Sequence, residues 1–246
     1  HTPKSYKNYL LHVPFLLRCL ALVLVILVLA RPQTTNKWQN SEIEGIDIML
    51  AIDVSTSMLA EDLKPNRLEA AKDVAAEFIN GRPNDNIGIT LFAGETFTQC
   101  PLTVDHAVLL DMIHNIKCGL ITDGTAVGMG IANAVTRLKD SKAKSKVIIL
   151  LTDGTNNKGD ISPMTAAEIA KSFGIRVYTI GVGTNGMAPY PYPVGNTVQY
   201  VSMPVEIDEK TLTEIAGTTD GNYFRATSNS KLKEVYEEID KLEKTK

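Results

Sequence analysis

Residues 47–57 read DIMLAIDVSTS, and residues 146–154 read KVIILLTDG. Each stretch contains an apolar run of strand length that leads into an aspartate, Asp53 in the first and Asp153 in the second. Strands that are apolar without alternation suit a parallel sheet that is covered on both faces. Both runs are therefore predicted to be central strands whose carboxyl ends carry polar loops.

The same pattern of apolar runs and amphipathic stretches continues from Gly45 onward. Further strands are predicted at Ile87–Phe92 and Ile175–Val182, with a short edge strand at Thr96–Cys100 and a last strand at Asn222–Ala226. Helices are predicted at Arg67–Asn80, Asp105–Lys117, Val127–Lys139, Met164–Phe173, Asp208–Ala216 and Ser230–Leu242. This alternation predicts an α/β fold with a doubly wound, mostly parallel sheet and one short antiparallel edge strand.

One segment departs from this pattern. Residues 184–206 contain many prolines and glycines and three tyrosines, Tyr190, Tyr192 and Tyr200. The segment is too broken for a helix and longer than an ordinary connection. Two interpretations stay open: an exposed binding surface, or a hairpin packed on its own domain.

The N-terminal region predicts a membrane segment. Residues 14–30 read PFLLRCLALVLVILVLA, and extension back through Tyr9 gives about 20 residues, enough to cross a bilayer. A cleaved signal peptide is the alternative, which the length of the run and Pro32 oppose. The predicted organisation is a flank at 1–8, a transmembrane helix at 9–30, a linker at 31–44 and a domain at 45–246. Lys4 and Lys7 favour a cytoplasmic flank, with the domain across the membrane.

The composition restricts the function classes. The chain has 246 residues, 44% of them hydrophobic and 22% charged, which indicates one sizeable core. A net charge of −3 without a basic stripe argues against nucleic acid as a partner. The cysteines at 19, 100 and 118 match no metal-binding spacing, and Cys100 and Cys118 flank a predicted helix about 20 Å long. We expect free thiols.

Polar residues at three loops predict a metal site. The D-x-S-x-S pattern at 53–57 and the Thr-Asp-Gly at 152–154 follow predicted parallel strands, and Thr-Asp-Gly-Thr at 122–125 opens a predicted helix. Open α/β sheets bind ligands at the carboxyl ends of their parallel strands. The predicted ligands are Asp53, Ser55, Ser57, Thr125 and Asp153. Their carboxylate and hydroxyl oxygens suit Mg²⁺ or Mn²⁺ rather than zinc.

This ligand set also indicates what the metal would bind. If the hydroxyls take inner positions and the carboxylates act partly through water, one octahedral position stays open. A carboxylate from another protein would fill that position. The neighbouring Asp123 is interpreted as a turn residue before Gly124, although a role as ligand or as acceptor to the site is an alternative.

Other chemistry finds less support in the sequence. Gly181 to Gly186 satisfies the G-x-G-x-x-G dinucleotide pattern, but the prolines that follow exclude the helix that this pattern requires. Phosphatases that begin with an aspartate after the first strand need a second aspartate two residues later, where this chain has Ser55. We therefore expect no enzymatic activity, and a Mg²⁺-dependent phosphatase is kept only as an alternative.

These motifs resemble a known family. D-V-S-T-S, the Gly-Thr of the second loop and T-D-G resemble the metal-ion-dependent adhesion site (MIDAS) of von Willebrand factor A domains, over Gly45 to Lys244. The stretches FAGETFTQCPLTVDH, DGTAVG, VIILLTDG and RVYTIGVGT are similar to the bacterial aerotolerance-operon (Bat) membrane proteins. The resemblance implies that Ser55, Ser57 and Thr125 bind the metal directly, and that Asp53 and Asp153 act chiefly through water.

The resemblance also implies a cellular setting. It implies an adaptor in the bacterial inner membrane with a periplasmic domain, holding Mg²⁺, or Mn²⁺ or Ca²⁺. The expected partners are a protein that supplies an Asp or Glu to the metal, other Bat-type membrane proteins and, directly or indirectly, a MoxR-type AAA+ ATPase. A structural scaffold in which the metal only stabilises the fold is the main alternative.

Overall fold

The computed structural model describes residues 13–29, 45–153, 156–194, 197–205 and 207–244. The predicted flank 1–8, the linker 31–44 and both ends of the predicted membrane segment lie outside these residues. Helix α2 (Val13–Leu29) forms a unit separate from the domain and exposes large apolar side chains such as Phe15 and Leu22. Within the described part of the chain, no helix combines the length and the apolar character needed to cross a membrane.

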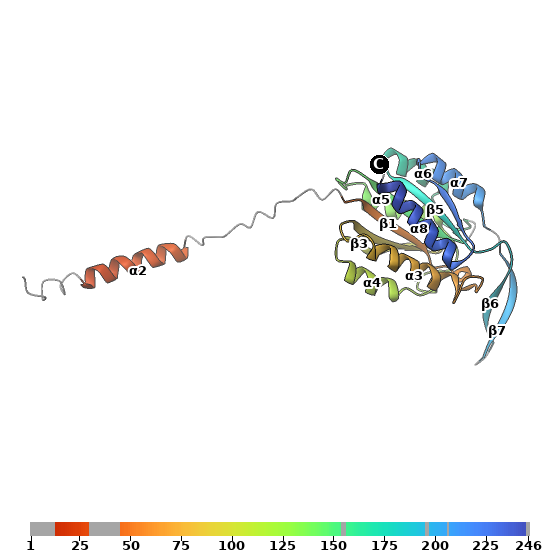
Figure 1. Cartoon of the computed structure of the whole chain (residues 1–246), viewed down its shortest axis with the longest axis horizontal. Coiled ribbons are helices and arrows are strands. Elements are labelled where there is room, and N and C mark those ends of the chain that lie inside the picture. The colour runs from red at the N-terminus through yellow and green to blue at the C-terminus, as the bar shows by residue number, and fades with distance from the viewer. Residues whose placement is uncertain (1–12, 30–44, 154–155, 195–196, 206, 245–246) are drawn as a thin grey trace, which may run out of the picture. The chain divides into compact units, whose positions relative to one another are not determined.

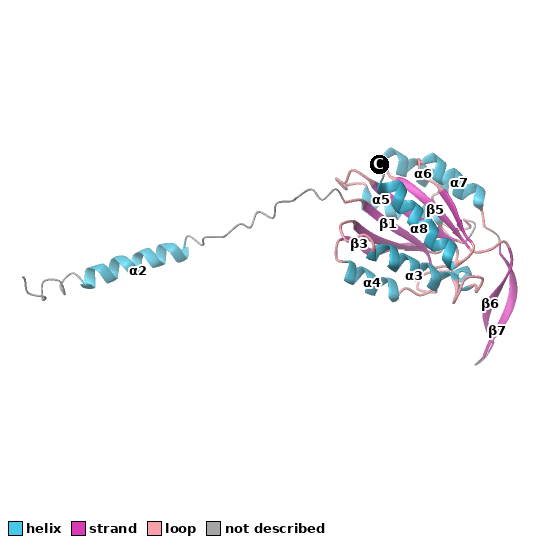
Figure 2. Cartoon of the chain, in the orientation of Figure 1, coloured by secondary structure: helices cyan, strands magenta, loops and turns pink. Residues whose placement is uncertain are grey.

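The domain is built on a six-stranded sheet in the order β3-β2-β1-β4-β5-β8 (Figures 1 and 2). All neighbouring strands are parallel except β2 and β3, which are antiparallel. The strands are β1 (Asp47–Asp53), β2 (Asn86–Phe92), β3 (Thr96–Thr103), β4 (Lys146–Thr152), β5 (Arg176–Val182) and β8 (Tyr223–Ala226). The predicted mostly parallel α/β sheet with an antiparallel edge strand is confirmed.

Helices cover both faces of this sheet. One face is covered by α3 (Arg67–Asn80), α4 (His106–His114) and α8 (Asn229–Lys244), and the other by α5 (Val127–Leu138), α6 (Pro163–Ser172) and α7 (Glu209–Thr218). Several helices begin at side chains that cap the first turn: Asn66 accepts from the backbone N–H of Glu69, and Asp208 accepts from that of Thr211.

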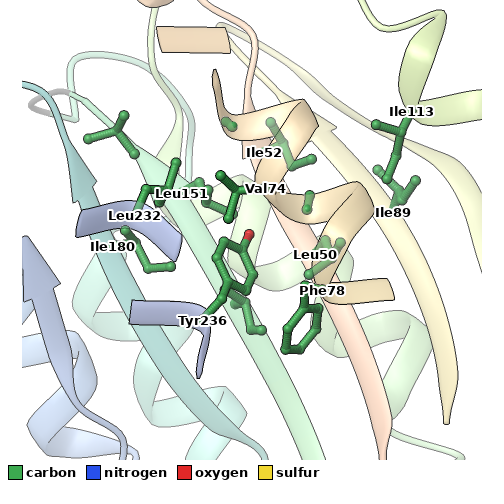
Figure 3. Close-up of a cluster of buried hydrophobic side chains, with 14 of the residues drawn as sticks. Leu50, Ile52, Val74, Phe78, Ile89, Ile113, Leu151, Ile180, Leu232 and Tyr236 are labelled. Carbon is green, nitrogen blue, oxygen red and sulfur yellow. The ribbon is translucent and has the colours of Figure 1, made fainter. Parts of the chain in front are cut away.

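Alternate residues of the central strands enter opposite halves of the core. In β1, Leu50 and Ile52 pack with the helices of the α3 face (Figure 3), whereas Met49 and Ala51 pack under α5. Every residue of β1 is buried. Burial of one large aliphatic side chain contributes about 1.5–3 kcal/mol, so these strands supply much of the stability of the domain.

The structure corrects the predicted boundaries in three places. The edge strand β3 extends beyond Cys100 to Thr103, since pairing with β2 resumes after an irregularity. Helix α4 ends at His114, three residues before the predicted end. A short 3-10 helix, η1 (Thr56–Leu59), follows β1 where only a loop was expected. The three cysteines are free, as predicted.

The segment at 184–206 contains a hairpin with its own two-stranded antiparallel sheet. Strand β6 (Gly186–Val194) pairs with β7 (Thr197–Val205), and the hairpin extends from the domain (Figure 1). The glycines at 181–186 lead from β5 into β6, with positive φ at Gly183 and Gly186. No helix follows them in this described stretch, as the prolines predicted.

The two ends of the domain meet at the amino-terminal edge of the sheet. The backbone N–H of Asp47 donates to the carbonyl of Ser145, and the Ser145 hydroxyl donates to Glu243 near the end of α8. The buried Glu243 carboxylate also accepts from Tyr178 at 2.6 Å and pairs with Arg176 at 3.0 Å. This edge lies opposite the carboxyl ends of β1 and β4, which carry the predicted metal ligands.

Candidate metal centre

The predicted ligands lie where the winding of the sheet changes direction. Strand β1 has β2 on one side and β4 on the other, so the connections after β1 and β4 run to opposite sides of the sheet. Side chains at the carboxyl ends of such a strand pair face a common crevice. Asp53 ends β1, and Asp153 follows the last residue of β4.

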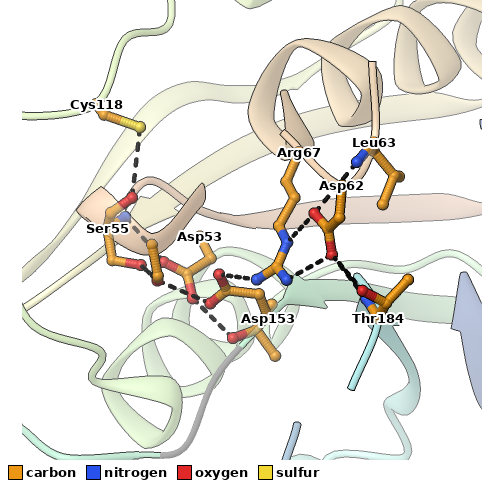
Figure 4. Close-up of polar contacts among 10 residues, drawn as sticks. Asp53, Ser55, Asp62, Leu63, Arg67, Cys118, Asp153 and Thr184 are labelled. Atoms are coloured by element: carbon orange, nitrogen blue, oxygen red, sulfur yellow. Dashed lines mark hydrogen bonds and ion pairs between the residues drawn. The ribbon is translucent and has the colours of Figure 1, made fainter. Parts of the chain in front are cut away.

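Hydrogen bonds join four of the five predicted ligands into one network (Figure 4). The Asp53 carboxylate accepts from the backbone N–H of Ser55 at 2.9 Å and from the hydroxyl of Thr152 at 2.7 Å. The Ser57 hydroxyl donates to Asp153 at 2.9 Å and lies 2.9 Å from the Ser55 hydroxyl. The structure therefore brings these two carboxylates and two hydroxyls together.

Thr125 belongs to a loop that is fixed beside this network. It is buried, and its backbone N–H donates to the Asn157 side chain while its carbonyl accepts from the N–H of Asn157. Asp123 of the same loop accepts from both the backbone N–H and the hydroxyl of Thr56, at 3.0 and 2.9 Å. The interpretation of Asp123 as only a turn residue was wrong, since its carboxylate attaches this loop to the D-x-S-x-S loop.

Two charged residues of the site were not predicted from the sequence. Arg67, 1% exposed at the start of α3, donates to Asp153 at 2.7 Å. Its other nitrogens donate to both carboxylate oxygens of Asp62, each at 2.7 Å. Asp62 in turn accepts from the backbone N–H and the hydroxyl of Thr184, just before the hairpin. No motif marks this chain of contacts, because Arg67 resembles any basic residue in a first helical turn.

The buried charges of this cluster do not balance. The cluster contains three carboxylates, those of Asp53, Asp62 and Asp153, but one guanidinium, which bonds with Asp62 and Asp153. Burial, and then the charge of Asp153, raises the pKa of Asp53 to about 7. Burial also raises the pKa of Asp153, although Arg67 acts to lower it. Burial acts in the same sense on Asp62, but its bonds with Arg67 and Thr184 hold its pKa below the usual value.

The donor set fits a divalent cation. With all three carboxylates ionised, two negative charges lack a partner within the cluster, which equals the charge of one such ion. Buried carboxylates without a partner are costly, and hard oxygen donors favour Mg²⁺, Mn²⁺ or Ca²⁺. Among the described residues, no group of three or more His, Cys, Asp or Glu side chains is arranged to hold a metal. A cation at Asp53 and Asp153 would therefore depend on the serine and threonine hydroxyls.

Known proteins are similar to this chain in sequence and in fold. The family model of the von Willebrand factor type A domain matches residues 47–238. A UPF0353 protein of Mycolicibacterium paratuberculosis is 32% identical over 92% of this chain and 68% of its own length. An uncharacterised protein of Borreliella burgdorferi is 28% identical over 98% of this chain and 71% of its own length.

Solved structures extend the comparison. BatB of Bacteroides thetaiotaomicron is 34% identical, with a TM-score of 0.71, over 81% of this chain and all of that one. An aerotolerance-related membrane protein of Bacteroides fragilis is 34% identical, with a TM-score of 0.69, over 80% of this chain and all of that one. Proximal thread matrix protein 1 from the mussel byssus, with a zinc-occupied MIDAS motif, is 25% identical over 80% of this chain and 45% of that one, with a TM-score of 0.63. The chain belongs to the von Willebrand factor type A domain family.

Proposed function

We propose that this protein is a membrane-associated adaptor that binds a partner protein through a divalent metal held by Asp53, Ser55, Ser57, Thr125 and Asp153. The observation that carries the proposal is the excess of carboxylates in the cluster: Asp53, Asp62 and Asp153 have one cation, Arg67, among them. The Thr152 hydroxyl donates to Asp53, and the Ser57 hydroxyl donates to Asp153. A bound cation supplies an open, positively charged position that accepts a carboxylate of the partner.

The residues of the chain would prepare this site in distinct ways. Thr152 and the Ser55 N–H orient the Asp53 carboxylate, and Arg67 orients that of Asp153. Asp123 attaches the Thr125 loop to the D-x-S-x-S loop through Thr56. The zinc-occupied motif of the mussel protein, in the same fold, supports a metal at this position.

Membrane association rests on the N-terminal segment and on the relatives. Helix α2 exposes large apolar side chains along the residues whose burial is described, and one structural neighbour is an aerotolerance-related membrane protein. We propose that residues 9–30 attach the domain to the bacterial inner membrane and that the domain is periplasmic. Membrane fractionation of the full chain and of a form lacking residues 9–30 tests the attachment, which fails if both forms stay with the membrane.

Metal binding is tested with Mn²⁺ on the full chain in detergent. Electron paramagnetic resonance of free Mn²⁺ should show one bound ion in the wild type and a loss of affinity of at least tenfold in Ser57→Ala. Ser172→Ala removes an exposed serine of α6 and is the matched control, with unchanged affinity expected. Equal binding by both variants would exclude the proposed ligand set.

Partner binding is tested by purification of the tagged full chain from membranes in mild detergent, with Mg²⁺ or with chelator. The proposal expects partner proteins that are lost with chelator and in Ser57→Ala, with Bat-type membrane proteins and a MoxR-type ATPase among them. Partners that persist under both conditions would support the scaffold alternative. Magnesium-dependent turnover of a generic phosphomonoester by the wild type would support the phosphatase alternative.

A further inference from the structure

The hairpin β6–β7 is unusual in composition for an exposed element. Residues 186–205 include no Asp, Glu, Lys or Arg, although these make up 22% of the chain. Several of its large side chains are nevertheless in contact with water, among them Tyr192 at 56% exposure and Met203 at 43%. Exposed strands are ordinarily protected by charge, and an uncharged apolar surface of this kind is typical of the centre of a protein interface.

The two faces of the hairpin differ. Residues opposite each other in an antiparallel pair share a face, so Ala188 lies with Met203 and Tyr190 with Val201. Met187 and Pro204 are paired on the opposite face. Ala188 is buried against the domain, and exposure increases along the same face toward Tyr192.

The face of Ala188 and Met203 borders a groove beside the candidate metal centre. The groove has a volume of about 310 Å³. Thr56, Ser57 and Ala60 line it on the side of the domain. The hairpin residues that line it are Ala188, Tyr190, Tyr192, Met203, Pro204 and Val205. Since Ser57 is both a predicted metal ligand and a groove residue, the groove begins where the metal site ends.

The hairpin is held in place beside this groove. The backbone N–H of Glu61, just after η1, donates to the carbonyl of Pro189 at 2.9 Å. At the base, Thr184 donates to Asp62, which Arg67 connects to Asp153. The hairpin face is thus fixed relative to the metal ligands at two positions.

Prolines decide how a partner can approach. The carbonyl of Pro189 accepts from Glu61 and therefore points away from β7. Backbone groups at alternate positions of a strand point to the same side, so Pro191 and Pro193 lie on the same outer edge of β6. Proline has no N–H, so this edge offers no donor to an added strand at these positions. A partner therefore contacts the side chains of the groove rather than extending the hairpin at β6.

We infer that the groove selects the partner: it binds a bulky apolar side chain from a protein segment whose neighbouring acidic residue reaches the metal. The inference rests on the proposed function. Side chains two positions apart on an extended segment are about 7 Å apart and share a face. The recognised sequence therefore carries Asp or Glu with a large apolar or aromatic residue within two positions.

The test is selection of a phage-displayed library of random seven-residue peptides on the full chain in detergent with Mg²⁺. The wild type should enrich peptides that contain the acidic residue and the neighbouring apolar residue. Met203→Ser should keep the preference for the acid and lower the recovery of apolar-containing peptides by about tenfold. Met187→Ser, an exposed methionine on the opposite face, is the matched control and should select as the wild type does.

The outcomes separate the inference from the proposed function. Enrichment of acidic peptides without an apolar preference, or identical selection by Met203→Ser and Met187→Ser, overturns the groove and leaves the metal-dependent function intact. Enrichment that persists with chelator and in Ser57→Ala, or no enrichment at all, overturns both. If Met203→Ser lowers the mass of the particle in light scattering and leaves the selection unchanged, the face binds a second copy, and the inference is wrong.

Discussion

The six-stranded sheet and the β6–β7 hairpin use similar apolar residues under opposite conditions. In β1 and β4 nearly every side chain is buried, because helices cover both faces of the sheet. In the hairpin, Ala188 is buried while Tyr192, Val201 and Met203 remain largely exposed. Burial is what makes an apolar residue stabilising. The sheet therefore carries the stability of the domain, and the hairpin is available for contacts with other molecules.

The largest effect on stability is expected where the contacts of Arg67 connect the sheet to the base of the hairpin, through Asp153 and Asp62. Arg67→Ala leaves the buried carboxylates of Asp62 and Asp153 without their cation, and should lower the free energy of unfolding by about 3–5 kcal/mol. Urea unfolding of the full chain in chelator measures it. Arg137→Ala, which removes an exposed arginine of α5, should cost about 0.5 kcal/mol or less. Equal losses in the two variants would show that the buried ion pairs of Arg67 do not stabilise the domain.

Truncation in the sheet comes next. Ile149 of β4 is fully buried, so Ile149→Ala should lower the free energy of unfolding by about 2–5 kcal/mol through lost burial and a cavity. Tyr192→Ala, in the hairpin, removes a larger side chain and should cost about 0.5 kcal/mol or less. If Tyr192→Ala lowers the free energy of unfolding more than Ile149→Ala does, the hairpin rather than the sheet carries the stability, and the contrast between the two regions is wrong.

Bound metal should stabilise the domain, and this stabilisation should not depend on the hairpin. Mg²⁺ at about 100 times its dissociation constant should raise the free energy of unfolding by about 2.7 kcal/mol, because only the folded chain assembles the ligands. Differential unfolding with Mg²⁺ and with chelator measures this gain. It should disappear in Ser57→Ala and persist in Tyr192→Ala; persistence in both would place the ion elsewhere.

The smallest effect is expected at the tip of the hairpin. Replacement of residues 191–200 by Asn-Gly keeps the buried Ala188 and the bond from Glu61 to Pro189, and closes the strands at Tyr190 and Val201. The free energy of unfolding should change by about 0.5 kcal/mol or less, with Mn²⁺ affinity unchanged. Loss of either property would mean that the tip supports the domain.

The fold could be predicted because the pattern that specifies it is local. The apolar runs of β1 and β4 and the amphipathic pattern of α3 appear within a few residues of sequence, and the observed bounds agree closely with the predicted ones. The D-x-S-x-S loop and Asp153 were placed together because both follow parallel strands. These predictions required only the periodicity of side chains and the polarity of strand ends.

The remaining features depend on contacts between distant residues. The pairing of Arg67 with Asp153 spans 86 positions, and that of Asp62 with Thr184 spans 122. The attachment of Thr56 to Asp123 spans 67. No spacing rule connects such residues, so the orientation of the ligands could not be predicted. The hairpin could not be predicted because prolines at alternate positions lack the N–H that a paired strand needs. In β6 these prolines lie on the edge that faces away from β7, where no N–H is needed for pairing.

The meeting of Asp47 and Glu243 at Ser145 has a mechanical consequence. Strand β1 has seven residues, so its two ends lie about 20 Å apart. Any tether attached at either end of the domain pulls at the amino-terminal edge, a full strand length from the metal ligands. A force that pulls the two ends of the domain apart would first strain the hydrogen bonds of Ser145 with Asp47 and Glu243. The ligand loops, at the other end of the strands, would be strained last. A load-bearing attachment and a binding site can therefore operate at opposite poles of one sheet without distorting each other.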